Sequence, residues 1–190
     1  MPLRPNDSYL RTVFSLLIFC LLAGSFAQGA TPAAATALGQ FPAIEATDLD
    51  HARLNLPQDF AGQLNLVILS FAREQQQDVN TWIPAARQIQ SGHSKFRFYE
   101  PLIMSRQNFL YRWWFNAALR SNTTDKDLRD RILTAYVNKP RFKRSLDITN
   151  EKKVVALLVD QKGHVYWRAD GPCTDEGTHQ LLSAIQTNGL

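Results

Sequence analysis

Cysteine is almost absent from this chain, which has two in 190 residues, Cys20 and Cys173. Cys20 lies inside an N-terminal apolar run that we expect to be removed, so Cys173 becomes the one thiol of the mature protein. A single thiol can neither form an internal disulfide nor cycle as a dithiol. The sequence therefore excludes a disulfide-stapled fold and any reaction that needs a Cys-x-x-Cys pair.

The histidines are few and scattered. His51, His93, His164 and His179 include no pair at metal-ligand spacing, so we expect no metal and no cofactor. His179 and Cys173 can approach each other at the last predicted helix. A thiol-dependent oxidoreductase or peroxidase-like enzyme that uses Cys173 is therefore the alternative to a non-enzymatic protein, although a lone cysteine is more typical of a small structural residue.

A large excess of one charge is also missing. The formal net charge is +4, with 20% charged and 45% hydrophobic residues. This composition predicts one domain with a real core, and its mild basicity alone does not establish binding to nucleic acid or lipid. Because we also expect export, nucleic acid is not an expected partner.

An export signal is what the sequence presents first. Arg4 and Arg11 precede an apolar run over residues 13–22, and small residues follow as far as Ala27. This order predicts a signal peptide over residues 1–27 and a periplasmic or secreted protein. The run is shorter than the roughly 20 apolar residues that cross a bilayer, so an uncleaved membrane anchor is the less favoured alternative.

The remainder predicts a spacer and one α/β domain. Residues 28–40, rich in Ala and Thr, are typical of a flexible spacer, and the domain is expected over residues 41–190. Residues 64–71 form a continuous apolar run typical of a strand buried on both faces. Residues 78–90 carry apolar side chains at helical spacing, with Pro84 in the middle.

The other elements complete a mixed sheet with helices on both faces. They include a helical insertion over about residues 101–147. The other expected strands are residues 43–47, 53–56, 95–99, 154–159 and 165–167, and the other expected helices are residues 106–120, 125–137 and 175–186, the last capped by Thr174.

The start of the first long helix is similar to that of thioredoxins. In that family a buried strand ends in Phe, a Cys-x-x-Cys opens the helix and a proline follows, and here Phe71 and Pro84 stand at the same separation. The two cysteine positions fall on Gln76 and Val79. Between residues 141 and 171 there is no proline to match the family's cis-proline. The resemblance therefore implies a thioredoxin-like fold that is redox-inactive.

Longer segments resemble one particular family. They are residues 64–71 with Gln76 and Trp82, the Arg112-Trp113-Trp114 segment, residues 147–150 and residues 158–167. Together they look like the mitochondrial ATP synthase assembly factors, thioredoxin-like proteins that chaperone the membrane-embedded subunit 6 of the proton channel. The resemblance implies a chaperone or assembly module with a protein partner, a membrane protein being one candidate. An export signal fits a periplasmic relative.

The predicted insertion carries most of the net positive charge, interleaved with aromatic residues. Such a surface suits a hydrophobic helix of a partner or a peripheral membrane contact. Its aromatic residues are spread around the predicted helix, so we expect most of them to pack in the core. The binding candidates are the loop in the place of the thiols and the basic residues of the insertion: Gln75, Gln76, Arg141, Lys143 and Arg144.

Overall fold

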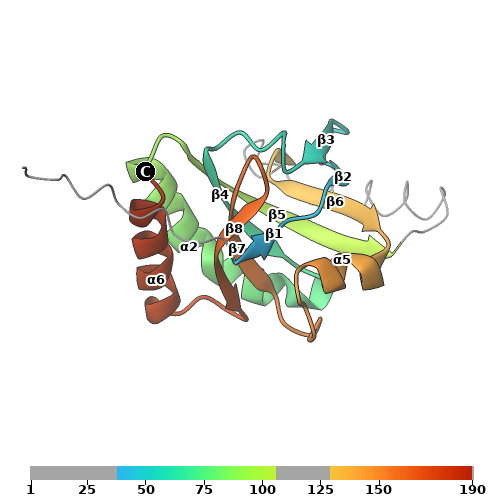
Figure 1. The fold of residues 1–190 in the computed structure, drawn as a ribbon. Coiled ribbons are helices and arrows are strands. Elements are labelled where there is room, and N and C mark those ends of the chain that lie inside the picture. The colour runs from blue at the N-terminus through green and yellow to red at the C-terminus, as the bar shows by residue number, and fades with distance from the viewer. Residues whose placement is uncertain (1–37, 106–128, 190) are drawn as a thin grey trace, which may run out of the picture. The chain divides into compact units, whose positions relative to one another are not determined.

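The computed structural model describes residues 38–105 and 129–189 (Figure 1). The predicted signal peptide, nearly all of the predicted spacer and the predicted helix at residues 106–120 lie outside the described residues. Within them the strands are β1 (Gly39–Gln40), β2 (Ile44–Thr47), β3 (Arg53–Leu56), β4 (Leu64–Leu69), β5 (Phe96–Ser105), β6 (Ile132–Val137), β7 (Val155–Asp160) and β8 (His164–Asp170). The helical elements are the 3-10 turn η1 (Arg73–Gln75) and the helices α2 (Gln76–Gly92), α5 (Lys139–Ser145) and α6 (Asp175–Thr187).

The described strands form a mixed sheet in the order β1-β8-β7-β4-β5-β6-β2-β3. The central strand β4 is buried along its whole length, runs parallel to β5 and antiparallel to β7, and so confirms the predicted buried strand. The β7–β8 hairpin and the edge pair β2–β3 are also confirmed. These pairings are those expected of a thioredoxin-like α/β sheet.

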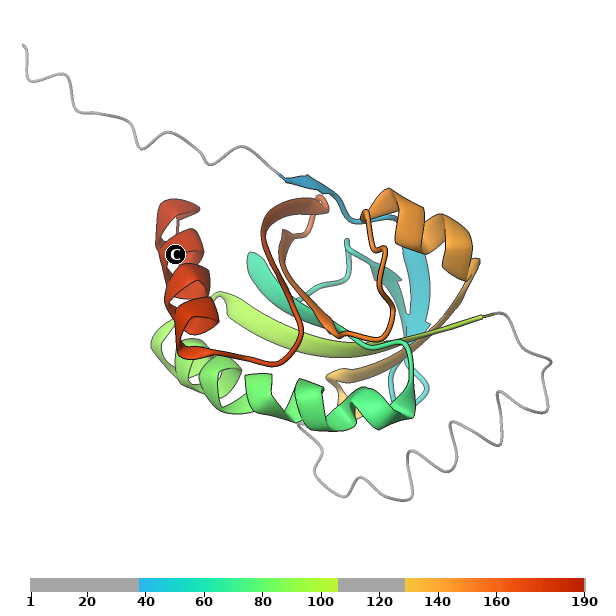
Figure 2. The ribbon, with the colours of Figure 1, turned by 90° about the horizontal axis from the view of Figure 1, so that it is seen from below.

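Helices cover both faces of this sheet, as predicted (Figure 2). On one face, α2 and α6 bury Trp82 and Leu181 against alternate residues of β4, β5 and β7. On the other face, Phe142 of α5 joins a second core cluster that includes Phe41 and Phe60. The sheet therefore separates two apolar cores and contributes side chains to both.

The two long helices form where the sequence predicted them. The buried residues of α2 are Val79, Trp82, Ala86 and Ile89, one stripe at helical spacing. At the start of α6, Thr174 Oγ1 accepts a hydrogen bond of 3.0 Å from the Gly177 backbone N–H, which satisfies one free donor of the first turn.

Residues 125–128 of the predicted helix at residues 125–137 lie outside the described residues, and the second half of this prediction is wrong. Ile132–Val137 is strand β6, which pairs in parallel with Glu100–Ser105 of β5 and places its edge against β2. Strand β5 also extends to Ser105, beyond the predicted end at Tyr99. The expected helical insertion over residues 101–147 therefore includes strand β6 and the end of strand β5. Ile132–Val137 is a short apolar run whose pattern is compatible with a helix or a strand. It forms a strand because it pairs with β5, which is distant in the sequence.

The folded part also begins before the predicted boundary at Phe41. Gly39 and Gln40 pair with β8, and Phe41 N–H donates to the Gly163 carbonyl at 2.7 Å. Gly163 has a φ of 90°, and a Cβ there would lie 3.0 Å from the backbone carbonyl oxygen of Phe41, directly after β1. A glycine is required at this turn both for its backbone angle and for the close approach of β1.

Candidate functional site

The loop between β4 and α2 stands where thioredoxins carry their thiols. Gln76 is the first residue of α2, Val79 lies three residues on in the same first turn and Pro84 lies inside the helix, so the predicted placement is confirmed. Val79 is 1% exposed and packs in the core. Gln76 is exposed and donates from Nε2 to Asn80 Oδ1 at 3.0 Å. Neither side chain offers a nucleophile.

Gln75, one residue earlier, is a buried structural link. Its Oε1 accepts from the backbone N–H groups of Phe71 at 2.6 Å and Ala72 at 3.2 Å. Its Nε2 donates to the Glu151 carbonyl, in the loop that leads to β7, at 3.0 Å. Gln75 is 7% exposed, so the structure places this binding candidate inside the protein, where it joins two loops.

Helix α5 docks beside this loop through lysines. Lys139 Nζ lies 3.3 Å from the Phe71 carbonyl, 5.6 Å from the centre of the Phe71 ring and 3.6 Å from Glu151 Oε2. Lys143 Nζ lies 3.2 Å from the same carboxylate oxygen, and this hydrogen bond holds the pKa of Glu151 below its ordinary value. These pairs are largely solvated, so each contributes little to stability.

The other two basic candidates are available at the surface. Arg141 and Arg144 are exposed, three positions apart and hence on one side of α5, and neither makes an ion pair among the described residues. Of the three predicted basic contacts, Lys143 is therefore partly engaged within the protein. We call Lys139, Arg141, Lys143 and Arg144 the α5 basic surface.

Cys173 lies in a different place, between β8 and α6. Its backbone N–H donates to Thr81 Oγ1 at 2.8 Å, and its Sγ lies 3.2 Å from Thr178 Oγ1. Within residues 38–105 and 129–189 no hydrogen bond or ion pair joins Cys173 to His179, which is exposed. The same residues hold no group of three or more His, Cys, Asp or Glu side chains that could bind a metal ion.

No helix in the described parts of the chain is both long enough and apolar enough to cross a bilayer. These residues form a thioredoxin-like scaffold in which Gln76 and Val79 occupy the usual thiol positions, with the basic helix α5 beside them. Such a site can bind another molecule but, through these residues, cannot exchange disulfides.

Similar structures share this fold. BsSco, a member of the Sco family of cytochrome c oxidase assembly proteins, is 11% identical with a TM-score of 0.56, covering 82% of this chain and 98% of that one. The copper-bound ScoI of Arabidopsis thaliana is 11% identical with a TM-score of 0.51, covering 78% and 99%. The thioredoxin domain of a Bacteroides vulgatus thiol-disulfide oxidoreductase is 16% identical with a TM-score of 0.50, covering 78% and 96%. No curated protein matches the sequence.

The fold and its altered site thus define a thioredoxin-like protein without the paired thiols in the described residues. The family model described as ATP10 protein matches residues 34–187, which is most of the chain. The chain therefore belongs to the ATP10 protein family. This confirms the resemblance drawn from the sequence and supports a role in assembling or chaperoning another protein.

Proposed function

We propose that this protein is an exported, redox-silent assembly factor that binds a membrane-embedded protein. The observation that carries the proposal is Gln75. It ties the loop that follows β4 to the loop that leads to β7 through three hydrogen bonds, directly before the two positions where a redox relative needs a reactive pair. Membership of the ATP10 protein family supports an ATP synthase subunit as the partner.

Export to the periplasm or beyond is supported by the order of basic, apolar and small residues over positions 1–27. The partner surface that we propose is the α5 basic surface. It is formed by a short helix with a proline in its first turn and an asparagine cap, so its shape is set by the fold before binding. A preformed basic surface favours acidic loops of a partner and speeds their encounter.

The first test removes three charges from this surface. Replacing Arg141, Lys143 and Arg144 together with Gln is expected to weaken binding to the partner about tenfold at low salt, if each charge is worth about 0.5 kcal/mol. The salt dependence of binding should fall as well, because fewer charges are left to screen. Co-purification from detergent-solubilised membranes at two salt concentrations measures both effects.

The control removes three exposed charges elsewhere: Arg53, Lys95 and Lys162, each to Gln. Both triple variants should unfold within about 4 °C of the parent, because solvated charges contribute little to stability. Equal binding by the two variants would show that the α5 basic surface is only a solvated face. A large loss of stability in the α5 variant alone would assign its charges a structural role.

A further inference from the structure

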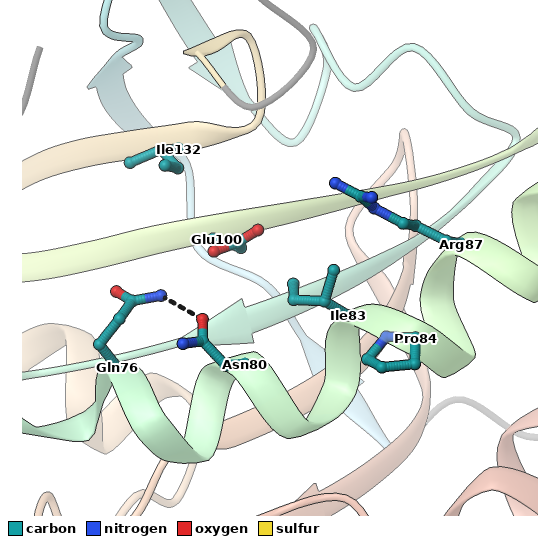
Figure 3. A pocket seen from close by; sticks show the side chains of 7 residues that line it. All are labelled: Gln76, Asn80, Ile83, Pro84, Arg87, Glu100 and Ile132. Atoms are coloured by element: carbon teal, nitrogen blue, oxygen red, sulfur yellow. Dashed lines mark hydrogen bonds between the residues drawn. The ribbon is translucent and has the colours of Figure 1, made fainter. Parts of the chain in front are cut away.

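A groove separate from the α5 basic surface runs between α2 and the sheet (Figure 3). Its volume is about 560 Å³. Ile83 and Pro84 of α2 and Ile132 of β6 give it apolar walls, and Glu100 of β5 lies between them. The remaining lining residues are Gln76, Asn80 and Arg87 on the same side of α2. Of the residues that line the groove, only Gln76 is a binding residue predicted from the sequence.

Glu100 is the unusual member of this groove. It is 7% exposed, and its Oε1 is buried with no hydrogen-bond partner in the part of the chain that the structure describes. Burial raises the pKa of this carboxyl, and the nearby Gln76 amide together with the charges of Arg131 and Arg87 acts in the opposite direction. A buried acceptor left unpaired is costly to a fold, so its presence calls for an explanation such as a ligand.

The chemistry of the groove limits what can fill it. Two arginines already act on the one carboxylate, so an added cation would meet net repulsion. An anion has no hydrogen to donate, so it would leave Oε1 unpaired. The apolar walls favour aliphatic side chains, and Oε1 needs a donor. A neutral donor, such as the amide of Asn or Gln or the hydroxyl of Ser or Thr, satisfies all of these conditions.

We propose that this groove docks an apolar segment of the partner protein, with a neutral hydrogen-bond donor seated on Glu100 Oε1. This proposal rests on the proposed function as a partner-binding protein. Segments of this kind are common in membrane proteins, whose apolar helices carry occasional Asn, Ser or Thr residues for contacts between helices. The α5 basic surface and the groove would then hold a loop and an apolar segment of one partner.

The test uses the full chain and three synthetic peptides. Each peptide has about nine residues of Leu and Ala and a neutral polyethylene glycol tail, with Asn, Ala or Lys at its centre. We expect the Asn peptide to bind at least tenfold more tightly than either of the others in fluorescence anisotropy, a difference of about 1.4 kcal/mol. Equal binding of the Asn and Ala peptides would overturn the role of Glu100, and preferred binding of the Lys peptide would overturn the neutral donor.

Two variants test whether Glu100 and the groove are responsible for the preference for the Asn peptide. Glu100→Leu should abolish the preference for Asn over Ala without lowering the thermal unfolding midpoint, because it removes an unpaired buried acceptor. A purely structural Glu100 would instead lower the midpoint and leave the preference unchanged. Asn80→Trp should block the groove and weaken the Asn peptide at least tenfold, whereas the control Gln88→Trp, exposed on α2 outside the groove, should not.

The peptide results and the co-purification results separate the two proposals. If peptides show no preference but the partner still co-purifies in a manner that depends on α5, the groove proposal fails and the assembly role stands. If peptides bind as expected but no membrane protein co-purifies, the groove is a binding site and the proposed function fails.

Discussion

Replacing Trp82 with alanine is expected to destabilise the domain by about 4 kcal/mol, the largest effect that we expect of a single substitution. Trp82 is 1% exposed on the inner side of α2, and its ring packs edge-on against Trp167 of β8 with centroids 5.8 Å apart. Its Nε1 donates to the Gly171 carbonyl at 3.0 Å. The alanine variant loses the packing, the ring pair and the hydrogen bond together.

The measurement is thermal unfolding followed by circular dichroism, in which the midpoint should fall by about 8–16 °C. Trp82→Phe is the matched control. It keeps an aromatic ring in the core but leaves the Gly171 carbonyl without its donor, so we expect a smaller loss of about 1–2 kcal/mol. If alanine cost no more than phenylalanine, Trp82 would not be the anchor between α2 and β8 that the packing indicates.

The second large effect is expected at Gln75. Changing it to alanine leaves the Phe71 and Ala72 N–H groups and the Glu151 carbonyl without the side chain that pairs them. We expect a loss of about 2–3 kcal/mol in the free energy of unfolding, since unpaired buried groups each carry a desolvation cost. Chemical denaturation with urea measures it.

Gln77→Ala is the control for Gln75→Ala. Gln77 is the same residue type two positions further on, exposed on the first turn of α2, and its loss should change the free energy of unfolding by less than about 0.5 kcal/mol. Equal effects of the two changes would mean that the bonds of Gln75 add nothing beyond those of an exposed glutamine. The proposal that this loop is fixed rather than reactive would then lose its support.

Local patterns in the sequence were enough to predict the elements that carry strong periodicity. The apolar stripe of α2, the continuous run of β4 and the Thr174 cap of α6 each identify their element without reference to the rest of the chain. Strand β6 was missed because Ile132–Val137 becomes a strand by pairing with β5, and pairing between distant segments leaves little trace in one sequence.

In the candidate site, too, local sequence patterns predict some features, whereas features that depend on distant contacts are not predicted. The spacing from Phe71 to Pro84 was sufficient to place Gln76 and Val79 at the start of α2. It could not show that Gln75 is buried, because the Glu151 carbonyl that it bonds is 76 positions away. The sequence also does not identify Glu100 as a residue of a binding site.

The only sequence signal for Glu100 is an acidic residue directly after the predicted strand at residues 95–99. That pattern marks an exposed strand end more often than a buried carboxylate, since charged residues are rarely buried without a partner. The exposure of Arg141 and Arg144, by contrast, follows from their charge, and the structure places both at the surface.

The most direct test is whether partner binding needs a thiol. Tagged full-length protein and its Cys173→Ser variant are recovered from membranes in mild detergent, each with and without dithiothreitol, and the co-purified proteins are identified by mass spectrometry. A redox-silent assembly factor should recover the same membrane protein in equal yield in all four samples. Loss of that protein in the Cys173→Ser variant, or its release from a mixed disulfide by dithiothreitol, would contradict binding without thiol chemistry.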